Sequence, residues 1–216
     1  MSIAAPPTVL TVRNVSKSFR SPRRPFGART RVLVDASLHV DRGEIVGLVG
    51  ENGSGKSTLM QIIAGRLGRD GGVTRIQGAI GYCPQYPQLW EKLTVAEHFE
   101  LFSLAYGLEP EAASTQRSRL LDDLSFARSL GYRVENLSGG TRQKLNLALA
   151  LLHEPDVLLL DEPYSGFDWE TYTRFWDLAE VYRSRGMAIL IVSHLIGEQS
   201  RLSRLYKLQD GTCVEA

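Results

Sequence analysis

The sequence predicts an α/β fold with a mainly parallel sheet, a small antiparallel β-subdomain and a helical subdomain inserted into the α/β core. Val157–Asp161 and Ala188–Ser193 contain short, continuous apolar runs, which are typical of strands buried on both faces. Helix-like segments separate these runs, and such alternation favours a parallel sheet. A glycine-rich segment, residues 50–58, lies between a predicted strand and a predicted helix.

The length and composition are those of one soluble domain, residues 1–216. The chain is 43% hydrophobic and 23% charged, and it is long enough to bury a sizeable core. A formal net charge of +1 indicates no bulk attraction to nucleic acid or membrane. The two cysteines, Cys83 and Cys213, make neither a disulfide framework nor a metal site, which favours a reducing cytoplasm. No apolar run approaches the about 20 residues of a spanning helix, and the N-terminal sequence is not that of a signal peptide.

The first half is predicted to hold the β-subdomain. Residues 19–32 are rich in arginine, proline and glycine and are expected to form an exposed loop. The expected elements are strands at 9–15, 33–40 and 44–49, a helix at 57–65, and short strands joined by glycine turns within 70–83.

Residues from about 86 to 136 are predicted to form the helical insert. Thr94 and Glu97 fit a capping box, in which each side chain satisfies the other residue's backbone N–H group. This box begins a helix that runs to about residue 106. The further elements expected are helices at 111–124, 126–130, 139–153, 171–185 and 196–201, and a closing hairpin of residues 205–209 and 213–215.

Residues 50–57 fit the phosphate-loop pattern G-x-x-x-x-G-K-[ST]. Glycines let successive backbone N–H groups turn toward a phosphate, and the following helix offers its positive end to the same anion. Lys56 is expected to reach the β- and γ-phosphates, and the Ser57 hydroxyl to bind Mg²⁺. The pattern therefore predicts a P-loop NTPase core that binds ATP and Mg²⁺. The predicted nucleotide-binding residues are Gly50, Asn52, Gly53, Ser54, Gly55, Lys56, Ser57 and Thr58.

A pair of acids follows the predicted strand Val157–Asp161. Asp161 at the strand end is suited to hold Mg²⁺, and Glu162 is suited to act as general base for an attacking water. A plain helix cap or surface pair is the alternative. The nearby phosphate loop favours the catalytic interpretation.

The segment LSGG, residues 137–140, is a second candidate anion site. Ser138 is able to cap the helix that follows, and Gly139 and Gly140 leave its N-terminus bare. A simple capped turn would have the same pattern.

Taken together, these motifs resemble the nucleotide-binding domains of ATP-binding cassette (ABC) transporters over nearly the whole chain. GENGSGKST resembles the Walker A loop, LSGGTRQ the family signature and VLLLDEP the Walker B strand. Thr141 stands where the family more often has Gln, and Phe167 where it has Leu. The stretch from residue 65 to 82 is short, so part of the β-subdomain is trimmed.

The resemblance implies roles for four further residues. Phe19 matches the aromatic that stacks on adenine, although Phe26 is a nearby competitor. Gln85 in YCPQ matches the Q-loop glutamine that touches Mg²⁺ or water. Asp168 in SGFD matches the D-loop, and His194 the switch histidine that contacts the γ-phosphate. Each has a simpler interpretation when taken alone, as a packing aromatic, a surface amide, a helix cap or a structural histidine.

In the family, two domains pack head to tail with each ATP between Walker A of one chain and the signature of the other. The resemblance implies a second nucleotide-binding domain as partner, identical or not, and a transmembrane permease subunit. It implies a cytoplasmic protein, held at the inner face of the cell membrane by that subunit. Residues 86–106 resemble exporters of the ABC-2 type, which favours export over import.

Two alternatives remain open. The first is a soluble cassette ATPase that acts on DNA or ribosomes. It would bind nucleic acid through basic residues such as Arg20, Arg23, Arg24, Arg29 and Arg31. A solvated loop is the simpler interpretation of these arginines, so a nucleic-acid partner is disfavoured. A nucleotide kinase or GTPase would share the phosphate loop but leaves LSGG unexplained.

Overall fold

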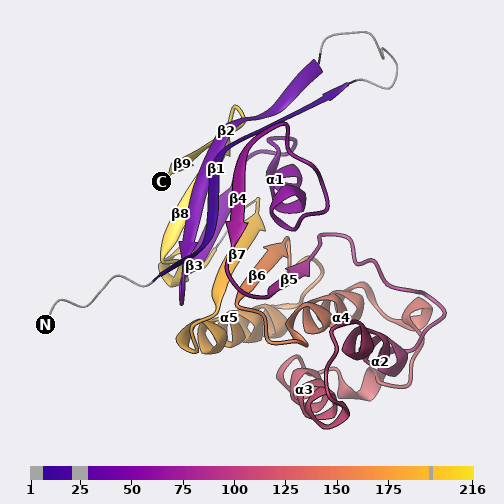
Figure 1. The fold of residues 1–216 in the computed structure, drawn as a ribbon. Helices are drawn as coiled ribbons and strands as arrows, with labels where there is room; N and C mark the ends of the chain where they lie inside the picture. Colours follow the sequence, from indigo (N-terminus) through magenta and orange to yellow (C-terminus); the bar gives the residue numbers. More distant parts are fainter. Residues whose placement is uncertain (1–6, 21–28, 195–196) are drawn as a thin grey trace, which may run out of the picture.

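The computed structural model describes residues 7–20, 29–194 and 197–216 and has a six-stranded sheet at its centre (Figure 1). The strand order is β5-β6-β7-β3-β8-β9. All neighbours pair in parallel except β8 and β9, which form the predicted closing hairpin. The mainly parallel sheet is thus confirmed. Its strands are β3 (Ile45–Val49), β5 (Ile80–Cys83), β6 (Val157–Asp161), β7 (Ala188–Ser193), β8 (Arg204–Gln209) and β9 (Thr212–Glu215).

Successive side chains of the inner strands enter two different hydrophobic cores. In β6, Leu158 and Leu160 pack in one core, whereas Val157 and Leu159 pack in the other. Side chains alternate between the faces of a strand, so a strand covered on both faces is apolar throughout. This is why the run VLLL predicted the strand with its observed bounds.

A second sheet of three antiparallel strands has the order β2-β1-β4. Its strands are β1 (Thr8–Arg20), β2 (Arg29–Asp41) and β4 (Gly71–Ile76). The first two are longer than predicted, because pairing continues through Phe19↔Thr30 and Arg20↔Arg29. The expected loop 19–32 is therefore wrong at both ends, since backbone hydrogen bonds form irrespective of the arginine side chains. Phe26, Arg23 and Arg24 lie outside the described residues.

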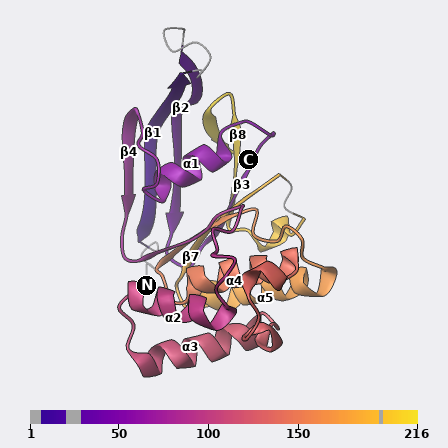
Figure 2. The same ribbon diagram turned by 90° about the vertical axis from the view of Figure 1, so that its right-hand side faces the viewer.

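Five α-helices cover the sheets in the described part of the chain. They are α1 (Lys56–Ile63), α2 (Val95–Ala105), α3 (Pro110–Asp123), α4 (Gly139–Leu151) and α5 (Trp169–Ser184). Figure 2 shows α1 beside the antiparallel sheet, and α2 to α5 gathered at the other end of the molecule. The Thr94–Glu97 capping box is present at the start of α2.

Short 3₁₀ turns replace two of the predicted helices. The predicted helix 126–130 contains only the turn Ala127–Ser129. A further 3₁₀ turn at Val134–Asn136 has no predicted counterpart. The predicted helix 196–201 is reduced to Gln199–Arg201, with residues 195–196 outside the described part. None of the helices that the structure describes has the length and apolarity needed to span a bilayer.

Candidate functional site

The carboxyl ends of four adjacent parallel strands, β5, β6, β7 and β3, meet at one edge of the central sheet. Ligands of open α/β sheets bind at this edge. The residues that follow these strands surround a cavity of about 650 Å³. Its lining residues are Val32, Asn52, Gly53, Gly55, Lys56, Ser57, Thr58, Gln85, Tyr86, Asp161, Glu162 and His194. The structure therefore brings together the predicted phosphate loop, both acids, Gln85 and His194.

The glycines of the phosphate loop are required by its backbone. Gly53 and Gly55 have φ angles of 81° and 105°, a region that other residues rarely adopt. A Cβ atom on Gly50 would lie 2.6 Å from the carbonyl oxygen of Leu208. The loop thus fits against the end of β8 only because it has no side chain there.

The interior of the loop presents donors to an anion. Lys56 is only 6% exposed, and its Nζ donates to the carbonyl oxygens of Gly50 and Glu51 at 2.7 and 3.0 Å. Ser54 Oγ is buried and has no hydrogen-bond partner among the described residues. Helix α1 begins after Gly55, which has no side chain to cap the first turn. Uncapped N–H groups, an orphaned hydroxyl and a buried ammonium group fit a polyphosphate.

Asp161 at the end of β6 lies next to the loop and is 2% exposed. Burial raises the pKa of Asp161, and repulsion from Glu162 adds to the rise, while the hydrogen bond from Ser57 and attraction to Lys56 oppose it. Ser57 Oγ lies 3.5 Å from Asp161 Oδ1. This pair of oxygens fits Mg²⁺, which takes one or two protein oxygens together with phosphate and water. No group of three or more His, Cys, Asp and Glu side chains suited to a metal occurs in the described residues.

Glu162 has an unusual backbone and two unlike carboxylate oxygens. Its φ is 50°, a conformation held by the hydrogen bond from its N–H to the Val192 carbonyl at 2.9 Å. Oε2 accepts a hydrogen bond from Ser193 Oγ at 3.0 Å. Oε1 is buried, has no hydrogen bond within the described part of the chain, and lies 3.4 Å from His194 Nε2. Oε2 is thus held by Ser193, whereas Oε1 lies beside His194 without a hydrogen bond in the described residues.

A second hollow of about 580 Å³ continues from the other side of the loop. Residues 51–54 share it with Thr30, Arg31 and Val32 of β2 and with the turn between β8 and β9, residues 207–211. No sequence pattern predicts that this turn lies near the loop, because only the fold brings the two together. Phe19 does not line this hollow. It is 40% exposed, pairs with Thr30, and has Lys17 Nζ 5.4 Å from its ring centroid.

The signature segment does not line the phosphate cavity of its own chain. Ser138 caps α4 by accepting from the Thr141 N–H at 3.2 Å. A Cβ atom on Gly140 would lie 2.8 Å from the Gly166 carbonyl oxygen, so the start of α4 fits closely against the loop before α5. Gly139 lines a separate hollow of about 410 Å³, together with Gln85 and Tyr86.

Asp168 likewise lies outside the phosphate cavity. It caps α5 by accepting from the Thr171 N–H at 2.8 Å. This backbone hydrogen bond is the main cause of the lowered pKa of Asp168. The simple interpretation of Asp168 as a helix cap thus holds within one chain.

A glycine-rich loop follows the parallel strand β3, and a buried acid ends β6, which is separated from β3 by β7 in the sheet. A phosphate loop with such an acid defines a P-loop nucleoside triphosphatase. Residues 33–165 match the sequence profile of the ABC transporter family. The ABC transporter ATP-binding protein YthP of Bacillus subtilis is 34% identical over 87% of this chain and 80% of its own length. The chain belongs to the ABC transporter family and is an ATP-binding cassette, a P-loop ATPase.

Other relatives extend the comparison. Human ATP-binding cassette sub-family A member 10 is 32% identical over 94% of this chain, which spans only 14% of that protein. Nod factor export ATP-binding protein I of Paraburkholderia xenovorans is 32% identical over 89% of this chain and 67% of its own length.

Solved structures share the fold. The ATP-binding subunit of an ABC transporter, 28% identical, superposes with a TM-score of 0.88 over 97% of this chain and 90% of that one. A dimeric bacterial cassette, 24% identical, gives a TM-score of 0.86 over 96% and 97% of the two chains.

Proposed function

We propose that this chain hydrolyses MgATP as one of two cassettes packed head to tail, and that it drives transport, with export favoured, through a separate membrane subunit. One observation carries the proposal. The phosphate loop, Asp161, Glu162, Gln85 and His194 come from four strand ends and line one cavity, whereas the signature glycines open elsewhere. A single chain thus supplies half of a site to the nucleotide and half to a partner.

The phosphate loop would hold the nucleotide. The backbone N–H groups of residues 50–58 and the Lys56 ammonium group would bind the β- and γ-phosphates, and Ser54 Oγ is placed to donate to them. The second hollow, which runs along the loop toward β2, offers space for the ribose, and the base would extend beyond this hollow toward Phe19. Phe19, near the end of β1, would stack on adenine.

Mg²⁺ would be held by Ser57, Gln85 and Asp161, which line the same cavity. When bound, the ion neutralises charge on the transferred phosphoryl group. The ion would also offset the free-energy cost of burying the charged Asp161 carboxylate.

Glu162 would act as the general base. A water oxygen attacks the γ-phosphorus, the bond to the ADP oxygen breaks, and the water proton passes to Oε1. His194, 3.4 Å from that oxygen, would contact the γ-phosphate. Ser138, Gly139 and Gly140 of the partner would bind the same phosphate from the other side, and Asp168 would lie between the two sites.

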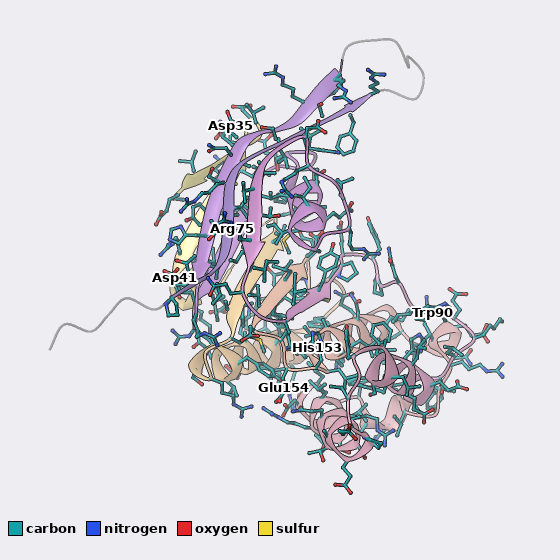
Figure 3. All side chains as sticks on the ribbon, in the orientation of Figure 1. Asp35, Asp41, Arg75, Trp90, His153 and Glu154 are labelled. Atoms are coloured by element: carbon teal, nitrogen blue, oxygen red, sulfur yellow. The ribbon has the colours of Figure 1, made fainter. Side chains whose placement is uncertain are left out.

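The membrane subunit would dock beside Gln85. Exposed aromatic and apolar side chains occur in and near the helical insert, which we place at about 86–136: Tyr86, Trp90, Leu101, Leu104 and Tyr132. Figure 3 shows Trp90 among the helices at the far end of the molecule from Asp35. Such a partner would hold the chain at the inner face of the cell membrane. The relative named for Nod factor export supports the direction, and the substrate would be chosen by the membrane subunit.

Mixing two inactive variants tests the head-to-tail site. Lys56→Ala removes the phosphate ligand but retains the signature, whereas Ser138→Arg blocks the signature but retains the loop. Each variant alone is expected to hydrolyse ATP at background rate. An equimolar mixture is expected to recover activity, because a mixed dimer has one complete site. A mixture as inactive as its components would contradict pairing between copies of this chain.

A further inference from the structure

Two residues, Ser193 and Tyr164, form a chain of hydrogen bonds that reaches Glu162. Ser193, the last residue of β7, donates to Glu162 Oε2 at 3.0 Å. Tyr164 lies two residues after Glu162 and shares a hydrogen bond with the Ser193 side chain. None of the motifs discussed above accounts for Tyr164 or Ser193.

The direction of these hydrogen bonds follows from counting protons. An ionised carboxylate only accepts, so the single Ser193 proton goes to Glu162. In the hydrogen bond between Tyr164 and Ser193, the serine oxygen is then the acceptor and the tyrosine hydroxyl is the donor. Burial raises the pKa of Tyr164 to about 12, so this proton is present throughout the physiological range.

The Tyr164 ring is held by aromatic side chains of α5. Its centroid lies 5.2 Å from that of Tyr172, 5.6 Å from Phe175 and 6.5 Å from Trp176, and the first two contacts are edge-to-face. Phe175 and Trp176 are buried. Offset and edge-to-face contacts of this kind are favourable and restrict the ring. Tyr164 itself lies in the turn between β6 and α5, and packing against the helix holds its ring in place.

We propose that Tyr164 and Ser193 are positioning residues that engage Glu162 Oε2 and leave Oε1 as the oxygen that accepts a proton from water. This inference rests on the proposed role of Glu162 as base. The carboxylate sits in a left-handed backbone position, φ 50°, and its Oε1 is buried without a hydrogen bond in the described residues. Without the Ser193 hydrogen bond, the carboxylate group is free to rotate, and its two oxygens compete for the place that Oε1 now holds.

Steady-state ATP hydrolysis by the full chain tests this arrangement. Ser193→Ala is expected to lower kcat about tenfold and Tyr164→Phe about threefold, while KM for ATP changes less than about twofold. Because the proposed effect of Tyr164 on Glu162 passes through Ser193, the double variant is expected to match Ser193→Ala rather than show the product of the two losses. Ser193→Thr retains a hydroxyl and is expected to recover most of the activity.

Tyr172→Phe is the matched control, because it removes a hydroxyl from the same aromatic cluster without touching the hydrogen-bonded chain. It is expected to retain wild-type kcat. Wild-type kcat in Ser193→Ala, multiplicative losses in the double variant, or a loss in Tyr172→Phe equal to that in Tyr164→Phe would each overturn the inference.

Measuring Glu162→Gln alongside distinguishes the role of Glu162 as general base from its positioning by Ser193 and Tyr164. Normal turnover by that variant would refute the role of Glu162 as general base, and with it the proposed function. An inactive Glu162→Gln beside fully active Ser193→Ala and Tyr164→Phe would leave the base in place and refute only its positioning.

Discussion

Replacing the Glu162 carboxylate by an amide should separate ATP binding from hydrolysis. In Glu162→Gln the side-chain carbonyl can still accept from Ser193, and the backbone bond to Val192 is untouched, so the cavity keeps its shape. What is lost is proton acceptance at Oε1. Loss of a general base costs about 10²- to 10⁴-fold in rate, or about 2.7–5.4 kcal/mol of barrier.

The variant should therefore bind MgATP and accumulate as an ATP-bound dimer. Phosphate release measures the turnover, and gel filtration with ATP present measures the dimer. Glu154→Gln is a close control, because Glu154 has nearly the same left-handed φ, 49°, but lies at the far end of α4 beside His153 (Figure 3). It should behave as wild type. Turnover by Glu162→Gln within about tenfold of wild type would refute the assignment of the base.

Three further perturbations test other parts of the structure. Gly55→Ala forces a Cβ to within 2.9 Å of Val32 Cγ1 at a φ of 105°. A strain of about 1–3 kcal/mol should weaken MgATP binding in a nucleotide titration by about 5- to 150-fold, whereas Gly68→Ala, with no atom within 4 Å, should not weaken it. Asp161→Asn should raise the melting temperature of the nucleotide-free protein at pH 7 by about 2–4 °C while abolishing Mg²⁺-dependent ATP hydrolysis. The direction of this change follows from the pKa of Asp161, which is higher in the folded protein than the unfolded value of 3.8. Ionising the buried carboxylate therefore lowers the stability of the wild type as the pH rises from the unfolded pKa through the folded pKa. The advantage of the variant should disappear in acid, where the wild-type carboxyl is protonated. Thr94→Ala removes the cap of α2 and should lower the free energy of unfolding in urea by about 1 kcal/mol, with ATP binding unchanged.

The sequence predicts the buried elements of the fold better than the exposed ones. Val157–Asp161 and Ala188–Ser193 have the predicted bounds because burial on both faces requires continuous apolar residues. β1 and β2 extend beyond prediction into arginine-rich sequence, because edge pairing places no such demand on side chains. Residues 126–130 have the apolar content of a helix but form one 3₁₀ turn, since tertiary packing of Phe126 decides the conformation of so short a segment.

The candidate site divides in the same way. Local motifs predict the phosphate loop and the acids, because a loop that holds phosphate needs glycines and a lysine at fixed spacing. Val32, Tyr86 and the turn at residues 207–211 enter the site only through tertiary structure, so no local pattern predicts them. Ser193 offered a weak signal, a hydroxyl directly before the strand-end histidine, but its bond to Glu162 depends on the pairing of β6 with β7.

Gln85 and Tyr86 connect the phosphate cavity with the hollow at the start of α4. Both line the phosphate cavity, and both line the hollow that Gly139 opens at the start of α4. The segment before them is tied to that helix, because Asn146 Nδ2 donates to Cys83 Sγ at 3.1 Å and to the Pro84 carbonyl at 2.8 Å. The first of these bonds is buried and the second is partly buried, and breaking them would leave unsatisfied polar groups, which is costly in a core. A shift of Gln85 toward a bound phosphate would therefore pull on α4. In this way the start of α4 would respond to a nucleotide in the phosphate cavity.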